Sequence, residues 1–181
     1  PAAPYTIDDF KREVIQHLKN RYGGDVEVGE KAVTIASNGN RRKADIIIAA
    51  EFRRYNRFNG MNDQRYDEGI TFWTSSGMQI INYPKQHSAN MTSKHQATNG
   101  FLKPMARILK NARGRLIESG AISKDTAPSY YLEGLLYNVP QEKFGRTYNQ
   151  TLFNCLEWLE SADKSNFVCA NEQYYLFWEN S

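Results

Sequence analysis

The chain has 181 residues, of which 40% are hydrophobic, and a formal net charge of +3. This length allows one domain or two small lobes around a hydrophobic core. The mild positive charge is compatible with an anionic ligand such as a nucleotide but does not require one. No apolar run reaches the roughly 18 residues that a transmembrane helix needs, and the two cysteines are too few for a disulfide framework. We therefore expect a soluble, cytoplasmic protein with no membrane partner.

The first predicted element is a helix over residues 6–22. Thr6 and Asp9 have the spacing of a capping box at its start, and apolar residues then recur at every fourth position. The alternating residues 25–37 predict two short strands with Gly29 between them.

Further strand patterns follow up to Pro84. The Asn38-Gly39 pair predicts a hairpin turn, and the next run, "NRRKADIIIAAEFRRY", predicts a strand. Residues 56–68 are polar and predict a loop, and residues 69–84 predict a second hairpin. Together these patterns predict a mixed, mostly antiparallel sheet that carries at least one helix.

After residue 84 the sequence pattern becomes helical. Helical spacing of apolar residues occurs within residues 97–120, 127–140 and 149–162. The aromatic-rich tail from residue 167 fits neither pattern clearly. The fold class is therefore predicted to be α+β, with a sheet-containing half followed by a helical half and room for a cleft between them.

One carboxylate interrupts the strand run in the first half. Alternation places Asp45 and Ile47 on one face and Ile46 and Ile48 on the other. A buried carboxylate without a partner is costly, so it normally has a hydrogen-bonding partner or a cation. Asp45 is either a strand-end aspartate bonded to backbone or arginine, or a metal ligand.

Four segments in this order resemble the bacterial cGAS/DncV-like nucleotidyltransferases of anti-phage signalling. They are "RKADIIIAAEFRRY", "GITFW…INYPKQH", "FLKPMARILKNAR" and "SYYLEGLLYNVP". Such enzymes are relatives of oligoadenylate synthetase and cyclic GMP-AMP synthase, and join nucleoside triphosphates into cyclic or linear oligonucleotide messengers. The resemblance implies a partial nucleotidyltransferase palm over residues 1–84, a helical C-terminal lobe over residues 85–181, and an active site between them.

The resemblance also gives Asp45 a role. It matches the third of three catalytic carboxylates, which hold two divalent cations. One cation lowers the pKa of the attacking hydroxyl and the other balances the charge of the triphosphate. Because hard cations prefer oxygen ligands, the implied cofactor of the complete enzyme is Mg²⁺, and Asp45 is the candidate catalytic and metal-binding residue.

Three residues of the helical half match nucleotide-binding positions of the family. Lys110 matches a lysine that contacts the donor triphosphate, while Ser129 and Tyr130 match a serine that bonds a phosphate and a tyrosine that stacks on the base. The alternatives are a solvated Lys110, and a helix N-cap at Ser129 followed by a core tyrosine. Lys94 falls at a further basic position of the family.

Other polar residues carry no predicted function. His87 and His95 lack a standard zinc spacing, so we expect structural or surface histidines. Glu133 is expected to form a local hydrogen bond within its helix, and Cys155 is expected in the core.

The sequence lacks the Gly-Ser turn and the Asp-x-Asp pair with which these enzymes hold the donor phosphates and the metals. The acidic pair Asp8-Asp9 opens a helix and does not substitute for them. We therefore expect the chain alone to be inactive, and prefer a fragment of a longer enzyme in which the missing N-terminal segment completes the site.

Two alternatives remain open. One is a split enzyme completed by another chain. The other is a non-catalytic module that binds nucleotides or nucleic acid, although nucleic acid is not a required partner. A palm without its first strand would expose a sheet edge, through which the chain could associate with itself.

Overall fold

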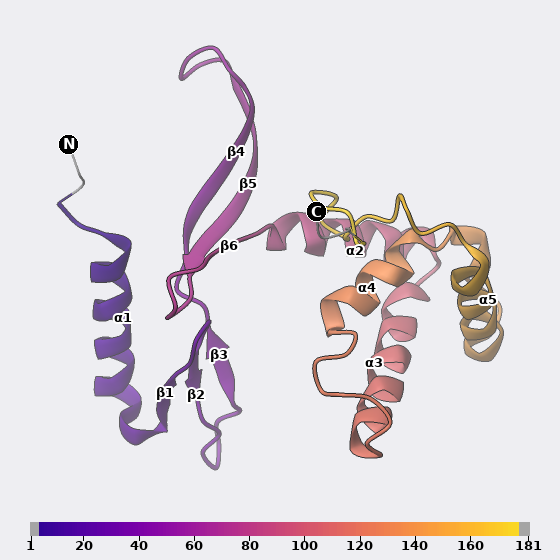
Figure 1. Cartoon of the computed structure of the whole chain (residues 1–181), viewed down its shortest axis with the longest axis horizontal. Helices are drawn as coiled ribbons and strands as arrows, with labels where there is room; N and C mark the ends of the chain where they lie inside the picture. The colour runs from indigo at the N-terminus through magenta and orange to yellow at the C-terminus, as the bar shows by residue number, and fades with distance from the viewer. Residues whose placement is uncertain (1–3, 178–181) are drawn as a thin grey trace. The chain divides into compact units, whose positions relative to one another are not determined.

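The computed structural model describes residues 4–177 (Figure 1). The described chain is α+β, as predicted, with two three-stranded antiparallel sheets and five α-helices. It divides into two compact units, one up to Asn82 and one from Tyr83 onward. The first unit contains both sheets and one helix, and the second contains the other four α-helices.

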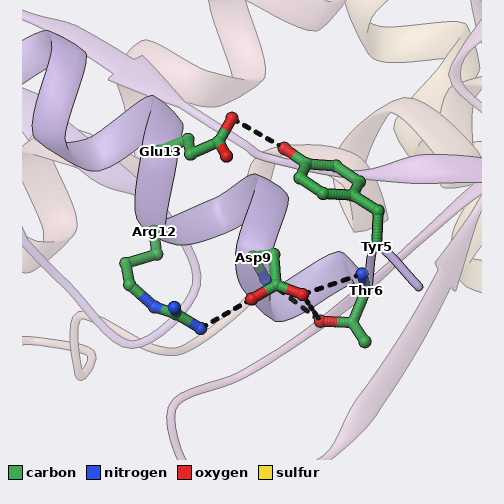
Figure 2. A network of polar contacts seen from close by, with 5 residues as sticks. All are labelled: Tyr5, Thr6, Asp9, Arg12 and Glu13. Atoms are coloured by element: carbon green, nitrogen blue, oxygen red, sulfur yellow. Dashed lines mark hydrogen bonds and ion pairs between the residues drawn. The ribbon is translucent and has the colours of Figure 1, made fainter.

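The first helix, α1 (Ile7–Tyr22), begins at the predicted capping box. The Thr6 side chain accepts a hydrogen bond from the Asp9 backbone N–H at 3.2 Å, and the Asp9 carboxylate accepts one from the Thr6 backbone N–H at 3.0 Å (Figure 2). The Thr6 hydroxyl also donates a hydrogen bond of 2.6 Å to Asp9 Oδ2. This bond, together with the one from the Thr6 backbone N–H and with the nearby Arg12 guanidinium, holds the pKa of Asp9 below its usual value. The local sequence therefore fixes where the helix begins.

The first sheet has the strand order β1-β2-β3, with antiparallel pairing throughout. Its strands are β1 (Val26–Val28), β2 (Val33–Ile35) and β3 (Ala44–Ile46). Val33 and Ile35 are buried and put the apolar face of β2 into the core of the sheet unit. The predicted turn before β3 is present, and Gly39 there adopts a φ of +47°, a conformation that glycine tolerates without strain.

The second sheet corrects the prediction of a loop over residues 56–68. Strands β4 (Ala50–Phe58) and β5 (Gln64–Trp73) form one long hairpin, and β6 (Gln79–Asn82) pairs with β5 (Figure 1). The outer part of the hairpin is held by the cross-strand pair Tyr55 and Tyr66, whose rings lie 5.4 Å apart. An ion pair of 2.6 Å also joins Arg57 on β4 to Asp63 in the turn. The polar residues of this segment are compatible with a strand because both faces of the outer hairpin are exposed to solvent.

The second unit consists mainly of helices. They are α2 (Pro84–Ala97), α3 (Leu102–Glu118), α4 (Ser129–Asn138) and α5 (Tyr148–Ser161). The last three were predicted, but α2 was not. Met91 is the only residue of α2 that is buried, so the helix has almost no apolar stripe by which to recognise it.

The core of the helical unit lies among α3, α4, α5 and the segment after α5. Leu102, Met105 and Leu136 are completely buried there. Cys155 is also fully buried, as predicted, and burial raises the pKa of its thiol to about 11. Within residues 4–177, no helix is both long enough and apolar enough to cross a membrane.

Candidate functional site

Asp45 lies on strand β3, at one edge of the first sheet. Its partner across the sheet is Thr34, whose hydroxyl donates a hydrogen bond of 2.6 Å to Asp45 Oδ1. The side chain is 58% exposed, and Lys43 Nζ lies 4.0 Å from Oδ1. The expectation of a buried carboxylate was therefore wrong, because Asp45 is on the face opposite the buried β2 residues.

The surroundings of Asp45 fit one ligand of a metal site. Its second carboxylate oxygen has no hydrogen-bond partner among residues 4–177, and carboxylate oxygen suits a hard cation such as Mg²⁺. No group of three or more His, Cys, Asp or Glu side chains in this part of the chain is arranged to hold a metal. The catalytic and metal-binding role of Asp45 stays a prediction.

Lys110 links two helices of the second unit. From α3 it donates a hydrogen bond to Glu133 Oε1 on α4. The Lys110 side chain is 33% exposed and the Glu133 side chain 22%. Lys110 is thus half-buried in an ion pair rather than freely solvated, and its contact with phosphate stays a prediction.

Glu133 does not make the local hydrogen bond that the sequence led us to expect. Its two carboxylate oxygens contact residues 23 and 46 positions away, Lys110 and His87. His87 Nε2 lies 2.9 Å from Glu133 Oε2, and the His87 side chain is 18% exposed. Because an ionised carboxylate only accepts hydrogen bonds, Nε2 carries the proton. The other ring nitrogen, Nδ1, is buried and has no hydrogen-bond partner among residues 4–177.

Tyr130 extends this set of contacts. Its ring stacks on the His87 ring, with centroids 4.8 Å apart and planes inclined by 24°. Burial, together with the neighbouring Cys169 thiol, raises the pKa of Tyr130. The phenol is therefore neutral near pH 7. One face of the ring is therefore covered by His87, and the contact of Tyr130 with a base stays a prediction.

Ser129 is the first residue of α4, and the N-cap position belongs to Pro128. The alternative of an N-cap serine is therefore wrong. The Ser129 side chain is exposed and has no hydrogen-bond partner among the described residues. It lies four positions before Glu133, a spacing that places both on one side of the helix.

The other residues singled out in the sequence lie apart from this network. His95 Nδ1 accepts a hydrogen bond of 3.3 Å from the Lys103 backbone N–H, a structural role as expected. Lys94 Nζ lies 5.9 Å from the centre of the Tyr137 ring, and burial lowers the pKa of Lys94.

The structure thus links Lys110 and Tyr130 through Glu133 and His87. Ser129 precedes Tyr130 on α4 and makes no hydrogen bond to this network. A cavity of about 300 Å³ adjoins this network. It is lined by His87, Ser88, Met91, Lys103, Ala106, Arg107, Lys110 and Glu133. A hollow with cationic side chains beside an aromatic ring is suited to a ligand that carries both phosphate and a base.

Comparison with known proteins establishes the family. Residues 89–181, just over half of the chain, match the model of the cGAS/DncV-like nucleotidyltransferase C-terminal helical domain. The chain belongs to the cGAS/DncV-like nucleotidyltransferases. The resemblance seen in the sequence is confirmed.

Individual relatives agree with this assignment. The chain is 42% identical to the cyclic UMP-AMP synthase of Rhodothermus marinus and 39% identical to the cyclic nucleotide synthase CdnE01 of Staphylococcus haemolyticus, over 97% of its length in each case. It spans 60% of the length of each of these relatives.

Solved structures show the same similarity. The Rhodothermus marinus CdnE c-UMP-AMP synthase with Apcpp and Upnpp has a TM-score of 0.88 and 41% identity, over 99% of this chain and 61% of that one. The Elizabethkingia meningoseptica CdnE cyclic dinucleotide synthase with GTP and Apcpp has a TM-score of 0.86 and 31% identity, over 99% of this chain and 66% of that one.

Proposed function

We propose that this chain is part of an enzyme that joins nucleoside triphosphates into a cyclic or linear oligonucleotide messenger of anti-phage signalling, and that its helical unit binds a nucleotide. The relatives named above are cyclic nucleotide synthases. The observation that carries the binding proposal is the network of Lys110, Glu133, His87 and Tyr130 beside a cavity.

Each predicted nucleotide-binding residue has a role that its position supports. Lys110 offers a compact positive charge to the triphosphate. Ser129 offers a hydroxyl at the start of α4, where the first N–H groups of the helix also favour an anion. Tyr130 offers a neutral aromatic face to the base, while its other face rests on His87.

Asp45 is the proposed contribution of the sheet unit to catalysis. Its carboxylate would hold Mg²⁺ in the complete enzyme, and Thr34 fixes the carboxylate by donating to one oxygen. A bound Mg²⁺ supplies charge neutralisation at the triphosphate and a lower pKa for the attacking hydroxyl. The sequence contains neither the Gly-Ser turn nor the Asp-x-Asp pair, so we propose that this chain binds a nucleotide without turning it over.

Calorimetric titration with ATP tests the binding proposal. The double variant Lys110→Ala, Tyr130→Ala should lose binding that the parent chain shows, because both the phosphate and the base contacts are gone. A matched control, Lys124→Ala with Tyr148→Ala, removes an exposed lysine and an exposed tyrosine of the same unit and should bind as the parent does. Circular dichroism would verify that both variants fold.

Two results would contradict the proposal. If the Lys110→Ala, Tyr130→Ala variant binds ATP as well as the parent, the nucleotide is placed wrongly. If the purified chain turns over ATP and GTP in the presence of Mg²⁺, it is not catalytically incomplete.

A further inference from the structure

Helix α1 is amphipathic, yet none of its 16 residues is buried. A surface helix of a folded domain normally turns its apolar stripe toward a core. Phe10, Val14 and Leu18 form such a stripe on α1, and Phe10 is 39% exposed. The helix meets the strands of its unit on another side, where Lys11 Nζ donates a hydrogen bond of 3.4 Å to the Trp73 carbonyl. Within the described chain, the apolar stripe therefore has no cover.

The stripe forms the floor of a groove of about 370 Å³ along the helix. The groove is lined by Tyr5, Phe10, Glu13, Val14, His17 and Leu18. Tyr5 is 50% exposed and donates a hydrogen bond of 2.9 Å to Glu13 Oε2, which holds its ring beside the first turns of α1 (Figure 2). An apolar groove along one helix is a surface into which a second helix can pack.

Charges of opposite sign lie toward the two ends of this groove. Glu13 lines its N-terminal half, and Arg21 follows His17 by four positions, which places it beyond the C-terminal end on the same side of the helix. Both charged side chains are exposed. In the described chain, Glu13 bonds only to the neutral Tyr5 hydroxyl, and the Arg21 guanidinium contacts only the Tyr22 ring, at 5.6 Å. Neither charge is matched by an opposite one.

Such a groove is complementary to a second copy of itself. Two α1 helices packed antiparallel bring the acidic end of each groove to the basic end of the other, and also oppose the two helix dipoles. If the helices cross near Val14, Phe10 of each copy lies against Leu18 of the other, because both are four positions from Val14. Long side chains on a helix point back toward its N-terminus, so Arg21 of each copy can reach Glu13 of the other.

We propose that the 181-residue chain forms a two-fold symmetric dimer through the groove of α1, with Glu13 of each copy paired with Arg21 of the other. The proposal goes beyond nucleotide binding and does not depend on it, because the groove and the cavity beside Lys110 share no residue. It also differs from association through a sheet edge, where backbone groups rather than side chains would make the contacts.

Light scattering after gel filtration, over a range of chain concentrations, tests the dimer. The mass of the parent should approach twice 20.8 kDa as the concentration rises. Glu13→Arg and Arg21→Glu should each weaken the dimer at least about tenfold, because in a two-fold pair each change sets like charges together at two places. The matched control Lys19→Glu reverses an exposed charge on the opposite side of the same turn and should leave the dimer unchanged.

An equimolar mixture of the Glu13→Arg and Arg21→Glu variants tests the antiparallel arrangement itself. In the mixed dimer, one contact joins the two substituted residues and the other joins the two native ones, so opposite charges meet at both. The mixture should therefore dimerise as tightly as the parent, and so should the chain that carries both substitutions. Circular dichroism would verify that each variant folds.

Four results would overturn the proposal. A parent that stays monomeric at every concentration would mean that another polypeptide covers the groove. A dimer that both single charge reversals leave intact would place the contact elsewhere, for example along a sheet edge. Equal weakening by Lys19→Glu would mean that general charge explains the effect. A mixture of the two variants that stays monomeric would contradict the pairing of Glu13 with Arg21.

Discussion

The two units of the chain present their candidate residues in different ways. In the sheet unit, Asp45 is an exposed carboxylate at the edge of a sheet, bonded to a single hydroxyl. In the helical unit, Lys110 and Tyr130 are tied to each other through Glu133 and His87, from three different helices. The helical unit thus holds its candidate residues in place by its own packing, whereas Asp45 is held by one neighbouring strand.

The largest expected effect comes from the core that supports this arrangement. Leu136→Ala should lower the free energy of unfolding by about 2–5 kcal/mol, because Leu136 is completely buried on α4 and its deletion leaves a cavity. Urea unfolding measures the loss. Leu116→Ala, at a leucine that is 46% exposed on α3, serves as the control. A loss as large in the control would contradict the placement of the core.

A deletion of one carboxylate from each unit compares them directly. Glu133→Ala should cost about 1–3 kcal/mol of unfolding free energy, because half-buried Lys110 and His87 both lose their partner. Asp45→Ala should cost less than about 1 kcal/mol, because the side chain is largely exposed. Both values come from urea unfolding. Equal losses of unfolding free energy in the two variants would contradict the difference between the half-buried Glu133 and the exposed Asp45.

The smallest effect concerns pH and the start of α1. The lowered pKa of Asp9 means that its ionised form stabilises the folded chain above about pH 4, and that this contribution is lost as the pH falls through the folded pKa. Thr6→Ala removes the hydrogen bond of the Thr6 hydroxyl, so its destabilisation should be larger at pH 6 than at pH 2. Unfolding measured at both pH values checks this, and a constant difference would contradict it.

Local signals in the sequence predicted most of the secondary structure. The capping box at Thr6 and the Asn38-Gly39 turn depend on neighbouring residues only, and both occur as predicted. Two elements were missed for a physical reason. Helix α2 buries only Met91, and the outer part of the β4–β5 hairpin is exposed on both faces, so neither shows the apolar periodicity by which a sequence reveals a helix or a strand.

The candidate site was less predictable. The resemblance to a family indicated Lys110, Ser129 and Tyr130, but nothing in the spacing of the residues indicated that His87 and Glu133 join them. These contacts span 23 and 46 residues, and only the packing of α2, α3 and α4 creates them. Burial of Asp45 was wrongly inferred from its apolar neighbours, because alternation along a strand does not say whether both faces are covered.

We propose that the helical unit holds a nucleotide beside the cavity that α2, α3 and α4 line. Nuclear magnetic resonance of the isotope-labelled chain, titrated with ATP, tests it residue by residue. We expect the shifted backbone signals to gather at Lys110, Ser129 and Tyr130. Shifts confined to the β4–β5 hairpin, or no shifts at saturating ATP, would contradict it.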